Sequence, residues 1–404
     1  MKKRILCIPI IICMLPLLSG CGSVYSNYRE VEQLLVVQTM GLDALPGGVK
    51  LTFAAPSTAR KDNSPVHLSG TGQSITEAIE HTRNYSSEEY LFCAHINHLV
   101  LGEATARQGV ENYLDYLCRS PEMRIDTPLY VVRDCEANEL IAGVIEGGIG
   151  ICEVLQAVKT NADERGDSYV FTAAQVLRGL NRYGSALLCA LDYSPSDEVS
   201  ADSASQSGSS GGSGSSQDGG SGEEGPSGSG RMTAAVSGYG VLKDGKLCAY
   251  IGREEAIGVS FLMNLAAVSH ITVHDMYGNP VTLEITGGGS SLTPVWEDGS
   301  LKGINVSAKV TASILEAQEA PRVSSASYED YITARLEEAV SERISAVLGL
   351  SRRLRADFLG LSGQVEMADP ILYRGMEQDF TQLLPQLELR VSVSGSLSHT
   401  NNLR

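Results

Sequence analysis

The hydrophobic positions before residue 196 follow the spacings of strands and helices in turn. Apolar residues alternate with polar ones or form short runs, as in strands, over residues 34–42, 49–55, 96–101 and 128–132. The sequence Leu45-Pro46-Gly47-Gly48 supplies turn dihedrals, so the first two strands are predicted to form a hairpin. Helices are predicted from Ser74, which stands at capping-box spacing from Glu77, and over residues 109–117 and 136–142.

After residue 230 strands predominate, together with one long helix. A hairpin is predicted through Lys243-Asp244-Gly245-Lys246, and further strands over residues 271–273, 281–285 and 306–312. The long helix is predicted over residues 328–350, where apolar residues recur at three- and four-residue steps, at Ile332, Leu336, Val340, Ile344, Val347 and Leu348. A half-buried strand is predicted where apolar and polar residues alternate, at Leu387, Leu389, Val391 and Val393.

This order of elements predicts an α+β fold with several domains, in which mixed β-sheets are flanked by helices. Strands occur in runs with helices between them, and the pattern shows no regular βαβ repeat. Residues 196–230 are mostly Gly and Ser with scattered acidic residues, so they are predicted to be a flexible linker. We expect an N-terminal region at residues 21–195, built from two subdomains, and a C-terminal domain at residues 231–404.

The first 20 residues predict a lipoprotein signal peptide. A basic start, Lys2-Lys3-Arg4, precedes an apolar run over residues 5–18. This run is too short to span a membrane, since a spanning helix needs roughly 20 apolar residues. Small residues then precede Cys21, whose thiol can carry a diacylglycerol thioether. The mature chain is therefore predicted to begin at a lipidated Cys21 and to lie on the extracytoplasmic face of a membrane.

Net charge limits the classes of ligand that are expected, and cysteine spacing bears on disulfide bonds. The net charge of −17 disfavours nucleic acid and anionic lipid head groups as ligands. Membrane contact is therefore expected through the lipid anchor or through protein partners. The cysteines beyond Cys21 are widely spaced in mostly apolar surroundings, where buried free thiols are common, so no particular disulfide pair is predicted and the disulfide state stays open; they are Cys93, Cys118, Cys135, Cys152, Cys189 and Cys248.

No catalytic, cofactor-binding or metal site is predicted. The sequence lacks G-x-S-x-G, H-E-x-x-H, C-x-x-C and a phosphate-binding loop. Cys93-x-His95-x-x-His98 is the nearest candidate for a metal or nucleophile site. On a strand, however, His95 and His98 would face opposite sides. We therefore interpret His95 as a structural residue in a buried segment.

Two other groups of charged or titratable residues have ordinary interpretations. His270 and His274 lie in a strand-like segment and are not expected to share a site. Arg352, Arg353 and Arg355 form a basic cluster, which we interpret as a solvated helix end, where cations complement the helix dipole. A docking surface for an acidic partner is the alternative for this cluster.

Five stretches of the chain form a recognisable set. They are Arg29-Glu30-Val31-Glu32, LFCAHINHLVLGEATAR at residues 91–107, RSPEMRIDTPLYVVRDCEANELI at residues 119–141, the hairpin VSGYGVLKDGKLCAYI, and Ala356-Asp357-Phe358-Leu359-Gly360. Together they resemble the Ger(x)C family, the C-subunit lipoproteins of spore germinant receptors. The chain departs from the family pattern in its tryptophans. Trp296 is its only one, and Gly22 and Tyr373 stand near positions where the family commonly has Trp.

The resemblance implies a non-enzymatic, lipid-anchored subunit of a germinant receptor at the inner spore membrane. It implies three mixed α+β domains, two before the linker and one after. It also implies a transporter-like integral membrane subunit and a second membrane subunit with large soluble domains as partners, and no catalytic residue or cofactor. The identity of the nutrient does not follow from it.

Two other classes of protein fit parts of the sequence. A lipid-anchored solute-binding protein of a transport system would share the signal peptide and the size, but it should contain βαβ repeats around a hinge. A surface hydrolase would need a convergent set of acid, base and nucleophile, which the sequence does not display.

The lipid anchor gives the first prediction. Cys21→Ala should abolish lipid attachment and leave folding intact, because Cys21 precedes the first predicted strand. Partition of the purified chain into detergent, with circular dichroism as the control for folding, measures both effects. A variant that still enters the detergent phase without a partner would contradict the lipoprotein assignment.

Overall fold

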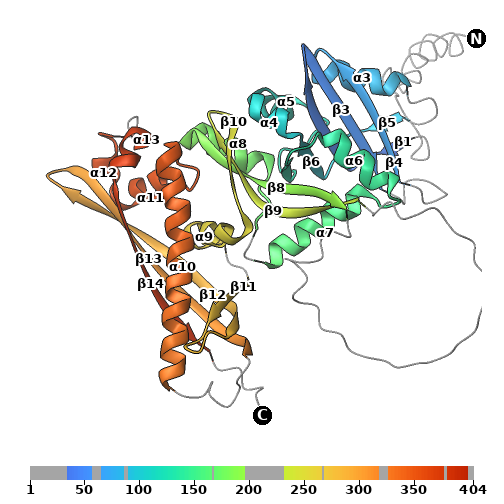
Figure 1. The fold of residues 1–404 in the computed structure, drawn as a ribbon. Coiled ribbons are helices and arrows are strands. Elements are labelled where there is room, and N and C mark those ends of the chain that lie inside the picture. The colour runs from blue at the N-terminus through green and yellow to red at the C-terminus, as the bar shows by residue number, and fades with distance from the viewer. Residues whose placement is uncertain are drawn as a thin grey trace, which may run out of the picture.

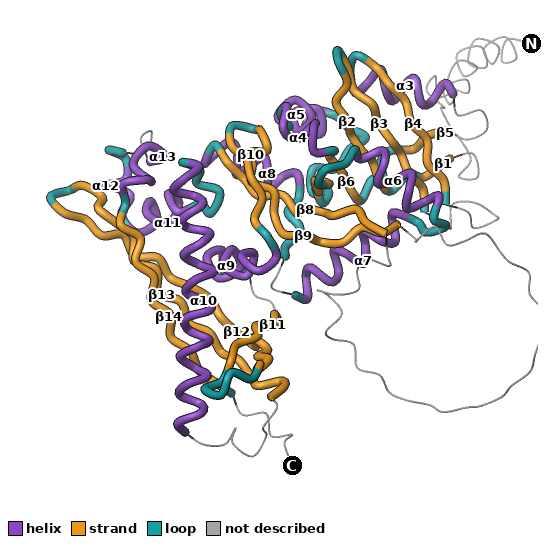
Figure 2. Tube along the Cα trace, viewed as in Figure 1, coloured by secondary structure: helices purple, strands orange, loops and turns teal. Residues whose placement is uncertain are grey.

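The computed structural model describes residues 34–56, 65–85, 90–165, 168–195, 232–265, 268–317, 326–376 and 380–398. Two β-sheets with helices on their faces lie side by side, and the helices α9 (Arg253–Met263) and α10 (Ala326–Leu354) lie where they meet (Figures 1 and 2). This mixed arrangement confirms the predicted α+β class. Cys21 and residues 196–230 lie outside the described residues, so the lipidation and the flexible linker stay predictions.

The larger sheet has eight strands in the order β10-β9-β8-β7-β6-β2-β3-β4. Their bounds are β2 (Thr39–Leu45), β3 (Gly48–Ala55), β4 (Val66–Gly72), β6 (His98–Leu101), β7 (Leu129–Val132), β8 (Ser185–Pro195), β9 (Met232–Lys243) and β10 (Lys246–Ile251). Two further short strands, β1 (Leu34–Val36) and β5 (Tyr90–Phe92), pair in parallel beside it.

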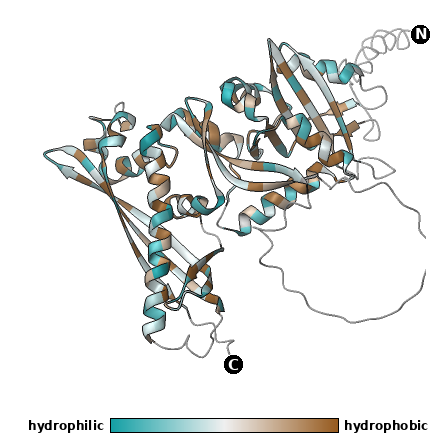
Figure 3. Ribbon diagram, in the orientation of Figure 1, coloured by the Kyte–Doolittle hydropathy of each residue, from teal (hydrophilic) through white to brown (hydrophobic). Residues whose placement is uncertain are grey.

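Both faces of the larger sheet are covered by helices. Val100 and Tyr130 point to the face that carries α6 (Ala137–Glu146) and α7 (Ile151–Glu164). The adjacent Leu99 and Leu129 point to the opposite face, which carries α3 (Ile75–Tyr85), α5 (Glu111–Arg119) and α8 (Ala173–Tyr183). This is the two-residue period of a strand, and Figure 3 shows hydrophobic and hydrophilic segments alternating along the strands of both sheets.

The centre of this sheet is parallel, which the sequence pattern did not predict. β2, β6, β7 and β8 pair in parallel. The short α4 (Glu103–Gln108) and α5 connect β6 to β7, and α6, α7 and α8 connect β7 to β8. Two βαβ crossovers are therefore present. The sequence pattern did not predict them because α4, α7 and α8 were not recognised. Antiparallel strands on both flanks keep the sheet mixed, as predicted.

The larger sheet continues across the position of the linker. β8 and β9 pair antiparallel from Ser185↔Lys243 to Pro195↔Met232. Residues 196–230 therefore connect two adjacent strands of one sheet. The division of the chain into domains at this segment stays a prediction, but β9 and β10 share a sheet with the strands that precede it.

The smaller sheet has four strands and is covered on one face by α10. Its order is β11 (Ser269–His274), β12 (Pro280–Glu297), β13 (Ser300–Ala317) and β14 (Glu388–Leu397). The six apolar residues that define the predicted long helix are all buried in α10, which confirms that helix. Three short helices close this part of the molecule, α11 (Leu361–Ala368), α12 (Pro370–Tyr373) and α13 (Phe380–Leu383), followed by the 3-10 turn η5 (Leu384–Gln386).

Most predicted elements are present, with two differences in extent. Both hairpins are confirmed, with Leu45 paired to Gly48 and Lys243 to Lys246. The predicted strand over residues 34–42 is instead two strands, β1 and β2, because the Gln38 carbonyl between them accepts from the Asn97 and His98 N–H groups. β12 and β13 extend well beyond the predicted strands into a long hairpin. The prediction stopped short because the outer halves of these strands have too few apolar residues to show the strand period.

Candidate functional site

A cavity of about 400 Å³ lies where the larger sheet meets the helices that follow α10. One half of the molecule, the larger sheet with the helices on its faces, contributes the end of α8 and the β9–β10 turn. The other half, the smaller sheet with α10 and the helices that follow it, contributes the α10–α11 connection, α11, α12 and α13. The lining residues are Arg182, Tyr183, Gly184, Lys243, Asp244, Arg355, Ala356, Asp357, Ser362, Tyr373, Phe380, Thr381 and Gln382. Two of the stretches that carry the family resemblance, the β9–β10 hairpin and residues 356–360, therefore meet at this cavity.

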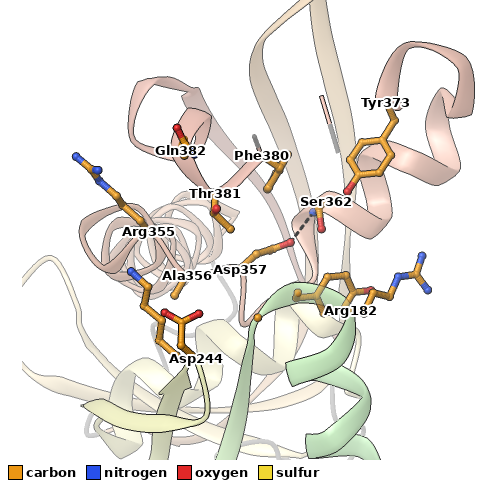
Figure 4. Close-up of a pocket in the computed structure, with 13 residues that line it drawn as sticks. Arg182, Asp244, Arg355, Ala356, Asp357, Ser362, Tyr373, Phe380, Thr381 and Gln382 are labelled. Carbon is orange, nitrogen blue, oxygen red and sulfur yellow. Dashed lines mark hydrogen bonds between the residues drawn. The ribbon is translucent and has the colours of Figure 1, made fainter. Parts of the chain in front are cut away.

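Local backbone chemistry places Asp357 at the floor of the cavity. Arg355 ends α10 in the left-handed region, with φ of +51°, and the Ser351 hydroxyl donates to the Ala356 carbonyl at 2.7 Å. Asp357 then accepts the backbone N–H group of Leu361 at 2.6 Å, at the start of α11. It also accepts the N–H group of Ser362 at 2.9 Å (Figure 4). Burial raises the pKa of Asp357 to about 6, while these N–H groups oppose the shift. Asp357 thus acts as the cap of α11.

Close contacts at this position join the two halves of the molecule. The Lys243 Nζ donates to the Leu354 carbonyl at 2.8 Å, and Arg182 pairs with Glu366 at 2.8 Å. The Tyr183 ring packs against Gly363, where an added Cβ would stand 2.6 Å from the tyrosine Oη. Glycine at residue 363 therefore leaves room for the close approach of the Tyr183 side chain.

The Asp357 carboxylate in this cavity is engaged by the protein itself. In Figure 4 the guanidinium groups of Arg182 and Arg355 point away from Asp357, toward the sides of the cavity. The described lining contains neither a histidine nor a cysteine, and the Asp357 carboxylate is occupied by N–H groups. The cavity is better described as part of a joint between the two halves.

The carboxyl edge of the parallel strands, where open α/β sheets commonly bind ligands, is closed by two carboxylates. Asp43 accepts the N–H groups of Ala137 and Asn138 at 2.8 Å each, and so caps α6. Glu103 accepts the Asp134 N–H at 2.6 Å and the Tyr250 hydroxyl at 3.0 Å. The sequence did not single out Asp43. Its capping role depends on the approach of α6 to β2, and no local pattern records that approach.

The Cys93, His95 and His98 candidates do not converge. β5 ends at Phe92, and the chain turns before β6, so His95 lies exposed in the turn. The interpretation of His95 as a buried strand residue is therefore wrong, because the chain needs these residues to pass from β5 to β6. His98 is the buried histidine, at 2% exposure. Burial raises the pKa of the Cys93 thiol to about 11, which keeps it protonated.

The remaining sequence candidates lie apart from one another. His270 and His274 are on β11, as the strand-like surroundings predicted, and four residues along a strand separate them by roughly 13 Å. Arg352 and Arg353 lie in the last turn of α10, and Arg352 donates to the Pro385 carbonyl at 2.8 Å. The six cysteines in the described part of the chain are free thiols.

Two further tests bear on the class of site. No group of three or more His, Cys, Asp or Glu residues in the described ranges is placed to hold a metal ion. No single helix in those ranges is long and apolar enough to cross a membrane, although α6 and α7 pass that test together as a pair bent by 108°.

Comparison with known proteins gives three findings. Residues 27–193 match the family described as the spore germination protein N-terminal domain, and residues 237–401 match the family described as spore germination B3/GerAC like, C-terminal. The crystal structure of the GerBC protein aligns with a TM-score of 0.53 and 17% identity, covering 89% of this chain and 97% of that one, which shows a shared fold. No curated protein matches this chain.

The joint gives the second prediction. Gly363→Ala should lower the free energy of unfolding by about 1–3 kcal/mol, because the new Cβ would meet the Tyr183 Oη at 2.6 Å. Tyr183→Phe in the same chain should recover part of the loss by removing that oxygen. Gly349→Ala in α10 is the matched control, since an added Cβ there meets nothing within 4 Å and should stabilise the helix by up to about 1 kcal/mol.

Chemical denaturation of the two single variants and the double variant measures the coupling between residues 183 and 363. A Gly363→Ala chain as stable as the wild type, with effects that simply add to those of Tyr183→Phe, would show that this contact does not join the two halves.

Proposed function

Because this chain belongs to the GerAC-like family of spore germination proteins, we propose that it is a lipid-anchored, non-enzymatic subunit of a germinant receptor complex. The order of the two family matches along one chain carries this proposal. In it, Cys21 holds the protein on the extracytoplasmic face of the inner spore membrane. The partners are a transporter-like membrane subunit and a second membrane subunit with large soluble domains, and nutrient-triggered germination requires the assembly.

The use of carboxylates in the structure supports the absence of catalysis. Asp43 and Asp357 each accept two backbone N–H groups at a helix start, and Glu103 bridges a loop and a strand. Carboxylates engaged in this way stabilise the fold and are not free to exchange protons with a substrate. The role we propose is therefore one of assembly with partners.

The anchor supports assembly on physical grounds. A lipidated chain is confined to the membrane surface, which raises its effective concentration toward partners that are embedded there. The acidic net charge of −17 makes the protein surface itself a poor ligand for anionic lipid. Contact with the membrane subunits then depends on the anchor and on protein surfaces.

The solute-binding alternative receives limited support from the fold. The parallel β2-β6-β7-β8 centre contains βαβ crossovers, which that class of protein also requires. However, the carboxyl edge of these strands is closed by Asp43 and Glu103. Calorimetry of the chain with free amino acids or sugars distinguishes the two functions, since tight binding of a nutrient by this subunit alone would favour the alternative.

Co-purification is the third prediction. A tagged chain expressed in its own spores, solubilised from their membranes in mild detergent, should carry both membrane subunits with it. An unrelated lipoprotein that bears residues 1–33 of this chain is the matched control and should carry neither. The receptor assignment fails if the chain is recovered alone from spores that still germinate normally in response to nutrients.

A further inference from the structure

The smaller sheet presents a long open edge at β14. In the described part of the chain, β14 pairs with β13 alone, in parallel from Gly303↔Glu388 to Ala312↔Leu397 (Figure 1). The pairing runs without a register shift, and the strand contains neither Pro nor Lys. Bulges, prolines and lysines are features that usually keep an edge strand from pairing with another chain. β14 has none of these protections.

The other edge strands of the two sheets are shorter. β4 has seven residues, and β10 has six, with a bulge between Leu247 and Ala249. β11 also has six, and the residue before it, Val268, bridges to Arg165. β14 has ten residues. It is therefore the edge with the most room for a further strand.

Alternate backbone groups of β14 point away from β13. The N–H and C=O groups of one residue in a strand point to the same side, and that side alternates along the chain. The N–H of Ser398, just after the strand, donates to the Ala312 carbonyl of β13 at 2.8 Å. The N–H of Gly395 points the other way and donates to the Glu337 Oε1 of α10 at 2.7 Å. The odd-numbered residues of β14 thus direct their backbone groups to the open edge.

Three of these residues combine free backbone groups with apolar side chains. The described residues offer no hydrogen-bond partner to the outward N–H and C=O groups of Leu389, Val391 and Val393. Their side chains are half-buried on the face that α10 covers, whereas the intervening Arg390 and Ser392 are exposed on the other face. A strand whose apolar residues alternate with polar ones would satisfy both the backbone groups and the apolar surface.

The charge beside this edge selects the kind of partner. Glu337 lies at one end of the open stretch, since an added Cβ at Gly395 would stand 3.1 Å from its Cγ. Within the described ranges Glu337 forms no ion pair. A second copy of β14 would bring only apolar side chains to this face, because its Arg390 lies on the other one, and each copy has a net charge of −17. A partner with a basic side chain fits better.

We propose that the β14 edge binds an extended segment of a protein partner as a fifth strand of the smaller sheet. The backbone of that segment pairs with residues 389–393, its apolar residues lie beside those of β14, and a Lys or Arg at one end meets Glu337. Backbone hydrogen bonds supply the affinity in this mode of recognition, and the alternating side chains supply the specificity. The inference does not depend on the lipid anchor or on the receptor assignment.

Hydrogen exchange of the full chain with synthetic peptides tests the proposal. The probes are two short peptides in which Val alternates with Thr, with Lys at either the first or the last residue, to cover parallel and antiparallel pairing. At saturation one of them should slow exchange of the Leu389, Val391 and Val393 amides about tenfold or more, because these amides become hydrogen-bonded. The β11 amides are the internal control. Unchanged exchange at β14 with both peptides, or slowing at β11 alone, would overturn the proposal.

Proline substitution tests the direction of the backbone groups. Val391→Pro removes an outward N–H and spares the ladder to β13, so it should abolish the protection of β14 by peptide. Val391→Thr is the matched control, which keeps the N–H and should keep the protection. Ser394→Pro removes an inward N–H and should lower the urea midpoint further than Val391→Pro does. Equal midpoints for the two proline variants would contradict the assignment of the open edge.

The charge is tested without a change in β14. Replacing the Lys of the binding peptide by Glu should weaken its affinity about threefold, as expected for an exposed ion pair. Glu337→Gln in the protein should remove this difference. A wild-type chain that binds both peptides equally would refute the preference for a basic partner.

Sedimentation velocity of the chain alone tests a second copy as the occupant. The chain should remain monomeric as its concentration is raised. A dimer that Val391→Pro abolishes would assign the edge to self-association and contradict the proposal.

Discussion

The ladder between β8 and β9 is the constraint on which the rest of the structure depends. It joins strands on either side of residues 196–230, from Ser185↔Lys243 to Pro195↔Met232. Leu188 and Tyr239 are fully buried within it, and loss of the pairing would expose both. The same β9 ends at Lys243, whose side chain reaches the Leu354 carbonyl at the end of α10. One pairing therefore positions the C-terminal helices against the larger sheet.

Given this pairing, a flexible segment of the kind that the composition of residues 196–230 predicts would constrain the fold little, whatever its length. The closure entropy of a flexible loop changes slowly with its length. A long acidic Ser/Gly segment can then be inserted between two adjacent strands without disturbing the ladder. The two regions that match spore germination domains, residues 27–193 and 237–401, share the larger sheet because β8 pairs with β9.

Buried carboxylates stabilise the other critical junctions. Asp43 brings α6 to β2, and Gly102 allows its approach, because a Cβ there would stand 2.2 Å from the Asp43 Oδ1. Asp357 turns the chain from α10 into α11. Buried acids of this kind can be mistaken for functional groups. Each of these two, however, accepts backbone N–H groups at the start of a helix, which is the geometry of a helix cap. Both carboxylates therefore stabilise the fold at these junctions.

The sequence predicted the elements whose signal is local. The hairpins at Leu45–Gly48 and Lys243–Lys246 depend on turn residues, and α10 depends on a helical apolar stripe, so all three were found. The parallel centre and the β8–β9 ladder depend on pairing between distant segments, which no local period records. His95 was misplaced because the alternation of a strand was extended through a turn, whereas the buried residue of that pair is His98.

Cleavage within the linker tests the central claim, that the two family-matched regions form one body held by the β8–β9 ladder. A site for a specific protease is inserted within residues 196–230, the chain is cut, and the fragments are separated by size under native conditions. The account predicts that the two fragments elute together at the size of the intact chain and separate only in denaturant. Fragments that separate in native buffer, each still folded, would contradict it.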